Sequence, residues 1–121
     1  MRHRILIIED QKEVALVLQE YLNDYGFITE VAINGKEAIE KFRLKAYDIL
    51  VTDFKLPDLD GITVVKTCKK ISPQVRVIYL TGYNLDLRNS KVKTGAYCKI
   101  MEKPCRPKNI LEAVNKILVQ K

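Results

Sequence analysis

Short apolar runs alternate with amphipathic stretches along all 121 residues, and this alternation limits the possible folds most strongly. The apolar runs have the length and the β-branched content of buried strands. The stretches between them place apolar residues three or four positions apart, which is the spacing of one helix face. We expect strands at Arg4–Ile8, Phe27–Ile33, Asp48–Thr52, Val75–Leu80 and Tyr97–Met101, and helices at Lys12–Tyr25, Lys36–Lys45, Ile62–Ile71, Asp86–Thr94 and from Pro107 onward.

The predicted fold is a single α/β domain. Strands that alternate with helices pair in parallel through right-handed crossovers, so that helices cover both faces of one sheet. The chain has the length of one domain and contains no linker or repeat, and we therefore expect one domain over residues 1–121. Five strand–helix units of this size favour a doubly wound, flavodoxin-like (βα)5 fold with a parallel five-stranded sheet in the order 2-1-3-4-5.

Local signals in the sequence mark the ends and faces of these elements. Gly26 is expected to stop the first helix, and the Asn34-Gly35 pair is expected to form a turn after the second strand. The first helix is expected to pack on one side through an apolar stripe. Its members are Val14, Val17, Leu18, Tyr21, Leu22 and Tyr25.

Composition excludes several classes of protein. No apolar run approaches the roughly 20 residues that cross a bilayer, and the first run ends at Glu9, so we expect a cytoplasmic protein. The 3 cysteines lack the spacing of a disulfide framework or a zinc site. The single histidine, His3, cannot pair with a Ser or Cys nucleophile away from the terminus. The chain also lacks a Gly-x-Gly-x-x-Gly fingerprint and a P-loop.

Charge is distributed unevenly along the chain. Residues 1–61 hold 8 Lys/Arg and 12 Asp/Glu, whereas residues 62–121 hold 13 Lys/Arg and 3 Asp/Glu. The C-terminal stretch 88–121 is especially basic, and the face formed by the fourth helix, the fifth strand and the last helix is expected to bind an acidic protein surface. A lysine-rich surface that is only solvated and binds no partner would give the same excess of Lys and Arg in this part of the chain. Direct nucleic-acid binding is not expected, because no reading element remains once the strands and helices are assigned.

Polar residues follow four of the predicted strands. Glu9 and Asp10 follow the first strand, Asp53 the third, Thr81 the fourth, and Lys103 the fifth. In an open parallel sheet, ligands bind beyond the carboxyl ends of the strands, where the strand order reverses. In the order 2-1-3-4-5 this point lies between the first and third strands, so the five side chains are expected to converge there.

This set of side chains suits phosphoryl transfer. Three clustered carboxylates repel one another unless a cation offsets them, and Mg²⁺ prefers such oxygen ligands. Lys103 adds a positive charge and Thr81 a hydroxyl donor. A carboxylate nucleophile, a metal and a lysine supply the positioning and charge neutralisation that a transferred phosphoryl group requires. A single aspartate after a strand is more often only a helix cap, so the prediction depends on the whole set.

The chain resembles the response-regulator receiver domains of two-component signalling, a CheY-like superfamily, from Arg4 to about Leu118. The resemblance is carried by five segments in order. They are Ile-Leu-Ile-Ile-Glu-Asp at 5–10, Asp-Ile-Leu-Val-Thr-Asp at 48–53, Leu-Pro-Asp-Leu-Asp-Gly at 56–61, Thr81-Gly82 and Lys103-Pro104.

The resemblance implies a role for each residue of the site. Asp53 would accept a phosphoryl group from the phosphohistidine of a sensor histidine kinase or a phosphotransfer protein. Asp10 would bind Mg²⁺ directly and Glu9 through water, together with Asp53 and the backbone carbonyl of Lys55. Lys103 would contact Asp53 and the phosphoryl oxygens, and Thr81 would turn toward them. The Lys103-Pro104 bond would be cis. Lys55 and Tyr83 would shield the phosphoryl group from water. The protein would catalyse only its own phosphorylation and dephosphorylation.

One position departs from the family pattern. The family places an aromatic residue in the fifth strand three residues before the lysine, where this chain has Ile100. Tyr97 is a candidate for the aromatic role. An alternative function is therefore a constitutive protein-interaction module that keeps the receiver fold with weak or lost switching. A fused output domain is a further expected partner if the chain is a fragment.

Overall fold

The structure, a computed structural model, describes residues 2–82 and 97–119. Five strands form one parallel sheet in the order β2-β1-β3-β4-β5. The predicted sheet order is thus confirmed. The expected helix at Asp86–Thr94 lies outside the described residues. The strands are β1 (Arg4–Ile8), β2 (Ile28–Ala32), β3 (Ile49–Asp53), β4 (Arg76–Thr81) and β5 (Cys98–Glu102), and the helices are α1 (Lys12–Asp24), α2 (Gly35–Leu44), α3 (Gly61–Ile71) and α5 (Pro107–Val119).

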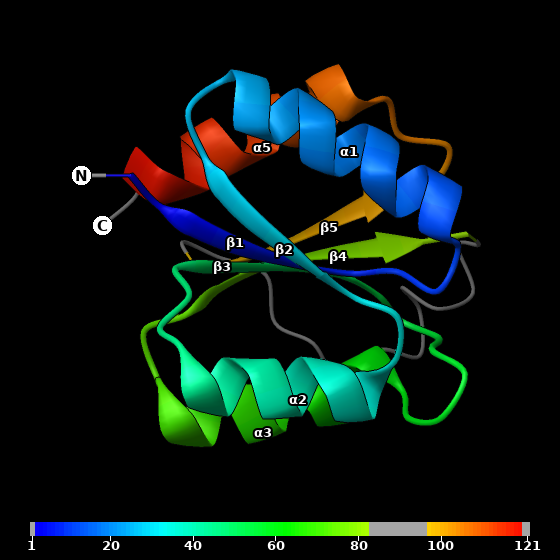
Figure 1. Ribbon diagram of the computed structural model, residues 1–121, viewed down its shortest axis with the longest axis vertical. Helices are drawn as coiled ribbons and strands as arrows, with labels where there is room; N and C mark the ends of the chain where they lie inside the picture. Colours follow the sequence, from blue (N-terminus) through cyan, green and yellow to red (C-terminus); the bar gives the residue numbers. More distant parts are fainter. Residues whose placement is uncertain (1, 83–96, 120–121) are drawn as a thin grey trace.

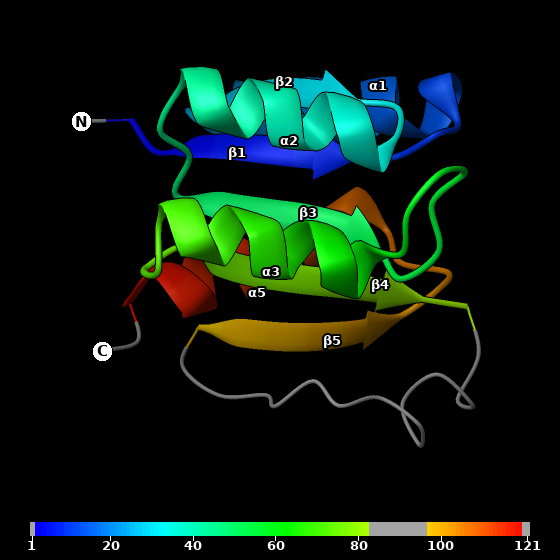
Figure 2. The ribbon, with the colours of Figure 1, turned by 90° about the horizontal axis from the view of Figure 1, so that it is seen from below.

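The helices lie in two layers, one on each face of the sheet. Helices α1 and α5 cover one face, and α2 and α3 cover the other (Figure 1). Seen from below, the strands lie side by side with their arrowheads toward the same end (Figure 2). The carboxyl ends of all five strands therefore meet at one edge of the sheet, where the polar residues were predicted.

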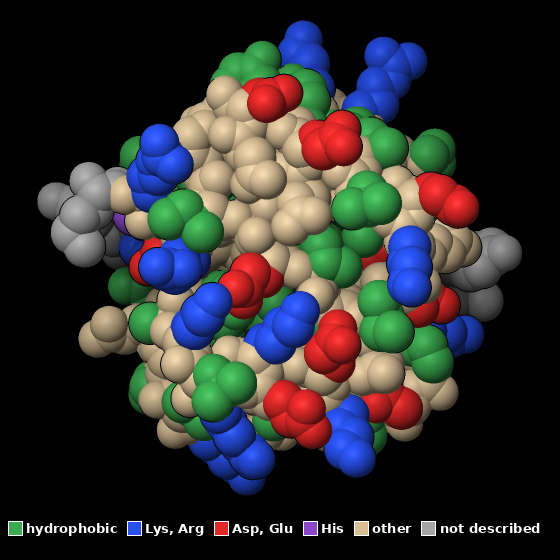
Figure 3. Space-filling model, in the orientation of Figure 1, with side chains coloured by type: hydrophobic (Ala, Val, Ile, Leu, Met, Phe, Trp, Pro, Cys, Tyr) green, Lys and Arg blue, Asp and Glu red, His purple; other side chains and the backbone are tan. Residues whose placement is uncertain are grey.

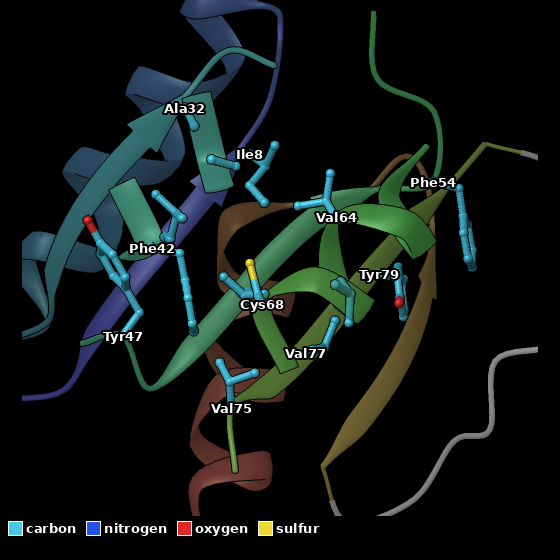
Figure 4. Packing of buried hydrophobic residues seen from close by; sticks show 14 residues of the cluster. Ile8, Ala32, Phe42, Tyr47, Phe54, Val64, Cys68, Val75, Val77 and Tyr79 are labelled. Carbon is cyan, nitrogen blue, oxygen red and sulfur yellow. The ribbon is translucent and has the colours of Figure 1, made fainter. Parts of the chain in front are cut away.

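Two apolar cores result from the side-chain alternation along the central strands. Leu6 and Leu50 point to the core beneath α2 and α3, and Figure 4 labels Phe42, Val64 and Cys68 in that same core. Alternate strand residues point to the second core, beneath α1 and α5. Its strand members include Ile5, Ile7, Ile49 and Val51, and its α5 members are Ile110, Leu111, Ala113, Val114 and Ile117. Burial of these side chains, at about 25 cal/mol per Å², is the main force that fixes the sheet.

Two local predictions are wrong. Only part of the α1 stripe is buried, because Val14, Val17 and Tyr25 are 49%, 58% and 59% exposed. Leu18 and Leu22 face the core, as expected.

The Asn34-Gly35 pair begins α2 rather than forming a separate turn, since the Asn34 side chain accepts a hydrogen bond from the N–H of Glu37 at 2.8 Å.

Candidate functional site

Three carboxylates meet at the carboxyl ends of the neighbouring strands β1 and β3. Glu9 follows β1 directly, and Asp53 is the last residue of β3, one residue later than the predicted strand end, because it still pairs with Leu80 of β4. Oxygen atoms of Glu9, Asp10 and Asp53 lie within 4.8 Å of one another. Glu9 and Asp53 are only 6% and 7% exposed, while Asp10 is open to solvent.

Lys103 reaches this acidic cluster from the loop after β5. Its backbone N–H donates to the carbonyl oxygen of Thr81 at 2.7 Å, and its bond to Pro104 is cis, as the resemblance implied. The Nζ atom lies 2.6 Å from Asp53 Oδ1 and 3.8 Å from Glu9 Oε1. The lysine therefore neutralises part of the charge that the buried carboxylates carry.

Burial and mutual repulsion shift the acid–base behaviour of the cluster. Burial, followed by the charge of Asp53, raises the pKa of Glu9 to about 7. Burial also raises the pKa of Asp53, although the hydrogen bond and the charge of Lys103 oppose this shift. Partial burial lowers the pKa of Lys103, but its hydrogen bond to Asp53 and the nearby carboxylates outweigh that effect and leave the pKa raised. The cluster favours a bound cation or a proton over three free negative charges.

A short loop, residues 54–60, leads from Asp53 to α3. The Gly61 N–H donates to the carbonyl oxygen of Phe54 at 2.6 Å, and Lys55 pairs with Asp60 in an antiparallel bridge. Asp60 then caps α3 by accepting from the N–H of Thr63 at 2.6 Å. A Cβ atom at Gly61 would lie 2.1 Å from the backbone oxygen of Asp53. Only glycine allows the loop to close so tightly against Asp53.

The remaining predicted residues differ in their surroundings. Thr81 ends β4 and is 1% exposed. Ile100 of β5 is partly buried against the core that contains Phe54 and Tyr79, whose rings stack with centroids 4.7 Å apart. Pro104 is exposed. Tyr83, the other predicted shielding residue, lies outside the described residues.

Sequence reasoning missed two features near the site. One is a mostly apolar groove of about 720 Å³ between α1 and the start of α5, which runs from Glu9 and Lys103 to residues such as Val14, Val17 and Pro107. In the sequence, the apolar stripe predicted for α1 is wider than one core-facing side of a helix needs, which could have indicated a surface groove. The helical spacing alone placed all of these residues in the core. The other is Asp58, which contacts residues more than twenty positions away, and no sequence pattern marks that contact.

The geometry fits a divalent cation. The three carboxylates offer hard oxygen ligands on a rigid strand edge, and the partly exposed Asp10 leaves room for retained water, which Mg²⁺ commonly keeps. The lysine beside Asp53 provides a second positive charge for any anionic group held at that carboxylate.

Comparisons with known proteins agree with this geometry. The family model for the response regulator receiver domain matches residues 5–115. The chain is 33% identical to the chemotaxis protein CheY of Bacillus subtilis over 98% of this chain and 99% of the relative. It is 34% identical to the sporulation initiation phosphotransferase F of the same organism, over 98% of this chain and 95% of that protein. The chain belongs to the response-regulator receiver family.

Solved structures support the same assignment. The crystal structure of a response regulator receiver domain protein from Clostridium thermocellum has a TM-score of 0.84 and 27% identity, with coverage of 96% of this chain and 94% of that chain. A receiver protein from Sinorhizobium medicae has a TM-score of 0.85 and 25% identity, with coverage of 99% and 98%.

Membership of the family fixes the general role of the chain. Receiver domains are signalling modules of two-component and chemotaxis systems, generally not enzymes, with a phosphoacceptor role and an acidic pocket that binds Mg²⁺. They interact with histidine kinases or phosphotransfer proteins and with output domains. No helix in residues 2–82 or 97–119 is long and apolar enough to span a membrane.

Proposed function

We propose that this chain accepts a phosphoryl group on Asp53 from a phosphohistidine donor, in a Mg²⁺-dependent reaction. The observation that carries the proposal is the ion pair of 2.6 Å between Lys103 Nζ and Asp53 Oδ1 within a cluster of three carboxylates. A buried carboxylate with a fixed positive partner at the carboxyl edge of the sheet is suited to both attack and charge neutralisation. One receiver domain over residues 1–121 would perform this function.

In the proposed reaction, a carboxylate oxygen of Asp53 attacks the phosphorus atom, and the bond from phosphorus to the histidine nitrogen breaks. The electron pair of that bond leaves with the imidazole. Bound Mg²⁺ would stabilise the charge on the phosphoryl oxygens. Asp10, Asp53 and the carbonyl of Lys55 would hold the metal, with Glu9 acting through water. Lys103 would pair first with Asp53 and then with the phosphoryl oxygens, and the Thr81 hydroxyl would donate a hydrogen bond to those oxygens.

The groove between α1 and α5 supports a protein as the phosphodonor. It opens beside Glu9 and Lys103, so a partner seated there would place its reactive group at Asp53. Hydrophobic side chains reach the surface over α1, in the upper half of Figure 3. Val14 and Val17, both about half exposed, would contribute apolar contact area next to the reacting atoms.

The surface of β5 and α5 is the part of the proposed output face that lies within the described residues. A small hollow of about 280 Å³ lies between these two elements, and both Lys99 and Lys116 line it, with Glu112 as the acidic residue. Its positive charge supports an acidic protein surface as the partner. Phosphorylation would change partner binding at this face. A cytoplasmic location stays a prediction.

A second candidate function follows from Ile100. With an aliphatic residue at this position, the chain would act as a constitutive interaction module, whose partner binding does not depend on phosphorylation. Partner affinity that is equal for the phosphorylated and unphosphorylated protein would favour this second function.

The proposal is tested by intact-mass spectrometry after incubation with acetyl phosphate, with and without Mg²⁺. We expect one added phosphoryl group in the wild type with Mg²⁺. We expect none without the metal and none in the Asp53→Asn variant, which retains the size of the side chain but lacks the nucleophilic carboxylate. No modification of the wild type by acetyl phosphate or by a phosphorylated histidine donor would contradict the proposal.

A further inference from the structure

Asp58 ties the loop after Asp53 to the beginning of α2. Its Oδ1 atom accepts from the N–H of Gly35 at 2.8 Å, and its Oδ2 atom accepts from the N–H of Lys36 at 2.9 Å. Oδ1 also accepts from the N–H of Leu59 at 2.9 Å, which fixes the carboxylate relative to its own loop. One exposed side chain thus joins its own loop to two residues, Gly35 and Lys36, that precede it in the chain by 23 and 22 positions.

The N-cap position of α2 is already filled by another residue, so the bonds from Asp58 are not needed for that cap. Asn34 is the N-cap residue, and its side chain already accepts from the N–H of Glu37 at 2.8 Å. Asp58 instead satisfies the first two N–H groups of the helix, at the end where the helix dipole favours a negative charge. Those hydrogen bonds, first from Gly35 and then from Lys36, lower the pKa of Asp58, so the tether is ionised at neutral pH.

Close packing supports the same connection. Gly35 is buried at the start of α2, and a Cβ atom there would lie 3.0 Å from Leu59 Cβ and 2.8 Å from Val64 Cγ2. The α2 backbone therefore rests directly on the loop and on the first turn of α3. The loop is held at its ends by the Gly61–Phe54 hydrogen bond and the Lys55–Asp60 bridge, and in its middle by Asp58.

We propose that Asp58 is a positioning residue for the cation site, because its tether to α2 fixes the loop that would present the Lys55 carbonyl beside Asp53. The inference rests on the proposed function, in which that carbonyl is a metal ligand. Asp58 lies three residues after Lys55 and is separated from it by Leu56 and Pro57. Loss of the tether would leave the carboxylates and the contacts at the ends of the loop in place but release its middle, so the metal would have a less well oriented oxygen ligand.

Three variants separate this role from simple capping of α2. Asp58→Ala removes the tether, and Asp58→Asn keeps an acceptor oxygen for Gly35 and Leu59 while it loses the charge. Asn34→Ala is the matched control, because it removes the other side-chain cap of the same helix end and leaves residues 54–60 untouched. Circular dichroism and thermal unfolding would establish that each variant is folded.

The readouts are the dissociation constant for Mg²⁺, by isothermal titration calorimetry, and the rate of labelling by acetyl phosphate as a function of Mg²⁺. We expect Asp58→Ala to weaken Mg²⁺ binding about tenfold, the size typical when an outer-shell partner is lost, and Asp58→Asn to weaken it less. Asn34→Ala should bind Mg²⁺ like the wild type. At saturating Mg²⁺ the labelling rate of Asp58→Ala should return to that of the wild type.

Other outcomes separate this inference from the function on which it rests. If the wild type binds Mg²⁺ and is labelled on Asp53 while Asp58→Ala binds Mg²⁺ equally well, the positioning role is overturned and the proposed function stands. Equal weakening in Asp58→Ala and Asn34→Ala would also overturn it, because general loosening of α2 would then be the cause. A wild type with no affinity for Mg²⁺ would overturn both.

Discussion

The two sides of the site come from strands in contrasting environments. Strands β1 and β3 lie in the middle of the sheet, and all five residues of β3 are buried. Strand β5 lies at the edge, and its residues are half-buried or exposed. The centre supplies Glu9 and Asp53, whose side chains are almost fully buried, whereas the loop after the edge strand supplies Lys103, whose side chain is 38% exposed.

This difference assigns separate physical tasks to the two regions. The central strands hold the carboxylates at fixed positions where burial disfavours their negative charge, so a nearby cation stabilises them. The edge supplies a positive charge on a long flexible side chain, which under the proposed function would turn from Asp53 toward the phosphoryl oxygens without disturbing the sheet. The acids are therefore held rigidly by the central strands, whereas the lysine side chain can adjust its position.

The largest expected effect comes from disturbing the backbone at the central strands. Gly61→Ala would place a Cβ atom 2.1 Å from the Asp53 carbonyl oxygen, a backbone atom that cannot move without β3. We expect a loss of about 3 kcal/mol in the free energy of unfolding, together with loss of labelling by acetyl phosphate.

Gly35→Ala is the matched comparison for this prediction. Its Cβ would meet Val64 Cγ2 at 2.8 Å and Leu59 Cβ at 3.0 Å, a less severe overlap than at Gly61 and one that does not involve Asp53, so we expect a smaller loss of stability and retained labelling. Urea denaturation followed by circular dichroism measures both variants. Equal losses in the two would contradict the special constraint at Asp53.

The second effect tests the burial of charge at the centre. The pKa of Glu9 is raised from 4.5 to about 7 by folding, so ionisation is easier in the unfolded chain. The metal-free protein should therefore lose stability as the pH rises from about 4.5 to about 7, and the loss should persist above pH 7. Glu9→Gln removes this group, and we expect it to be more stable than the wild type by about 2 kcal/mol at pH 8 in EDTA.

The same pair of proteins provides the control at low pH. Near pH 4 the wild-type Glu9 is mostly protonated in both states, so the advantage of Glu9→Gln should nearly disappear. Denaturation in EDTA at the two pH values measures the difference. An advantage of equal size at both pH values would mean that the charge of Glu9 is not its cause.

The smallest effect tests the edge. Lys103→Ala leaves the acids without their ammonium partner, and we expect a loss of about 1 kcal/mol in the metal-free protein, a value reduced because the lysine is partly exposed. Mg²⁺ should reduce this loss, since a metal bound at the cluster would neutralise the same carboxylates.

Lys45→Ala provides a matched ion pair far from the site. Its Nζ lies 2.7 Å from Glu30 Oε1, but that pair is more exposed, so we expect a loss of about 0.5 kcal/mol with no dependence on Mg²⁺. Thermal unfolding with and without Mg²⁺ compares the two variants. A loss of stability in Lys45→Ala that depends on Mg²⁺, or a loss in Lys103→Ala that does not, would contradict the role proposed for Lys103 as the positive partner of the buried carboxylates.

The strand ends could be predicted from the sequence because their signals are local. A run such as Ile5–Ile8 followed by Glu9 marks both a buried strand and its polar end, and the parallel sheet then brings such ends together. Asp53 and Lys103 were found in this way, although fifty residues separate them.

The rest depends on contacts that no local pattern encodes. Val14 and Val17 have the periodicity of core residues, yet the sheet and α5 cover only the neighbouring face of α1, so these side chains remain exposed. Asp58 looks like an ordinary loop residue until α2 is placed beside it. Tertiary packing decides both cases, and it follows only from the assembled fold.

The most direct test of the central claim is to locate the phosphoryl group chemically. Borohydride reduces an aspartyl phosphate to homoserine, so tandem mass spectrometry of the protein, labelled with acetyl phosphate and Mg²⁺ and then reduced, identifies the reacting carboxylate. We predict homoserine at position 53 and unchanged aspartate at positions 10, 58 and 60. Homoserine at any of those three positions, with Asp53 unmodified, would contradict the account.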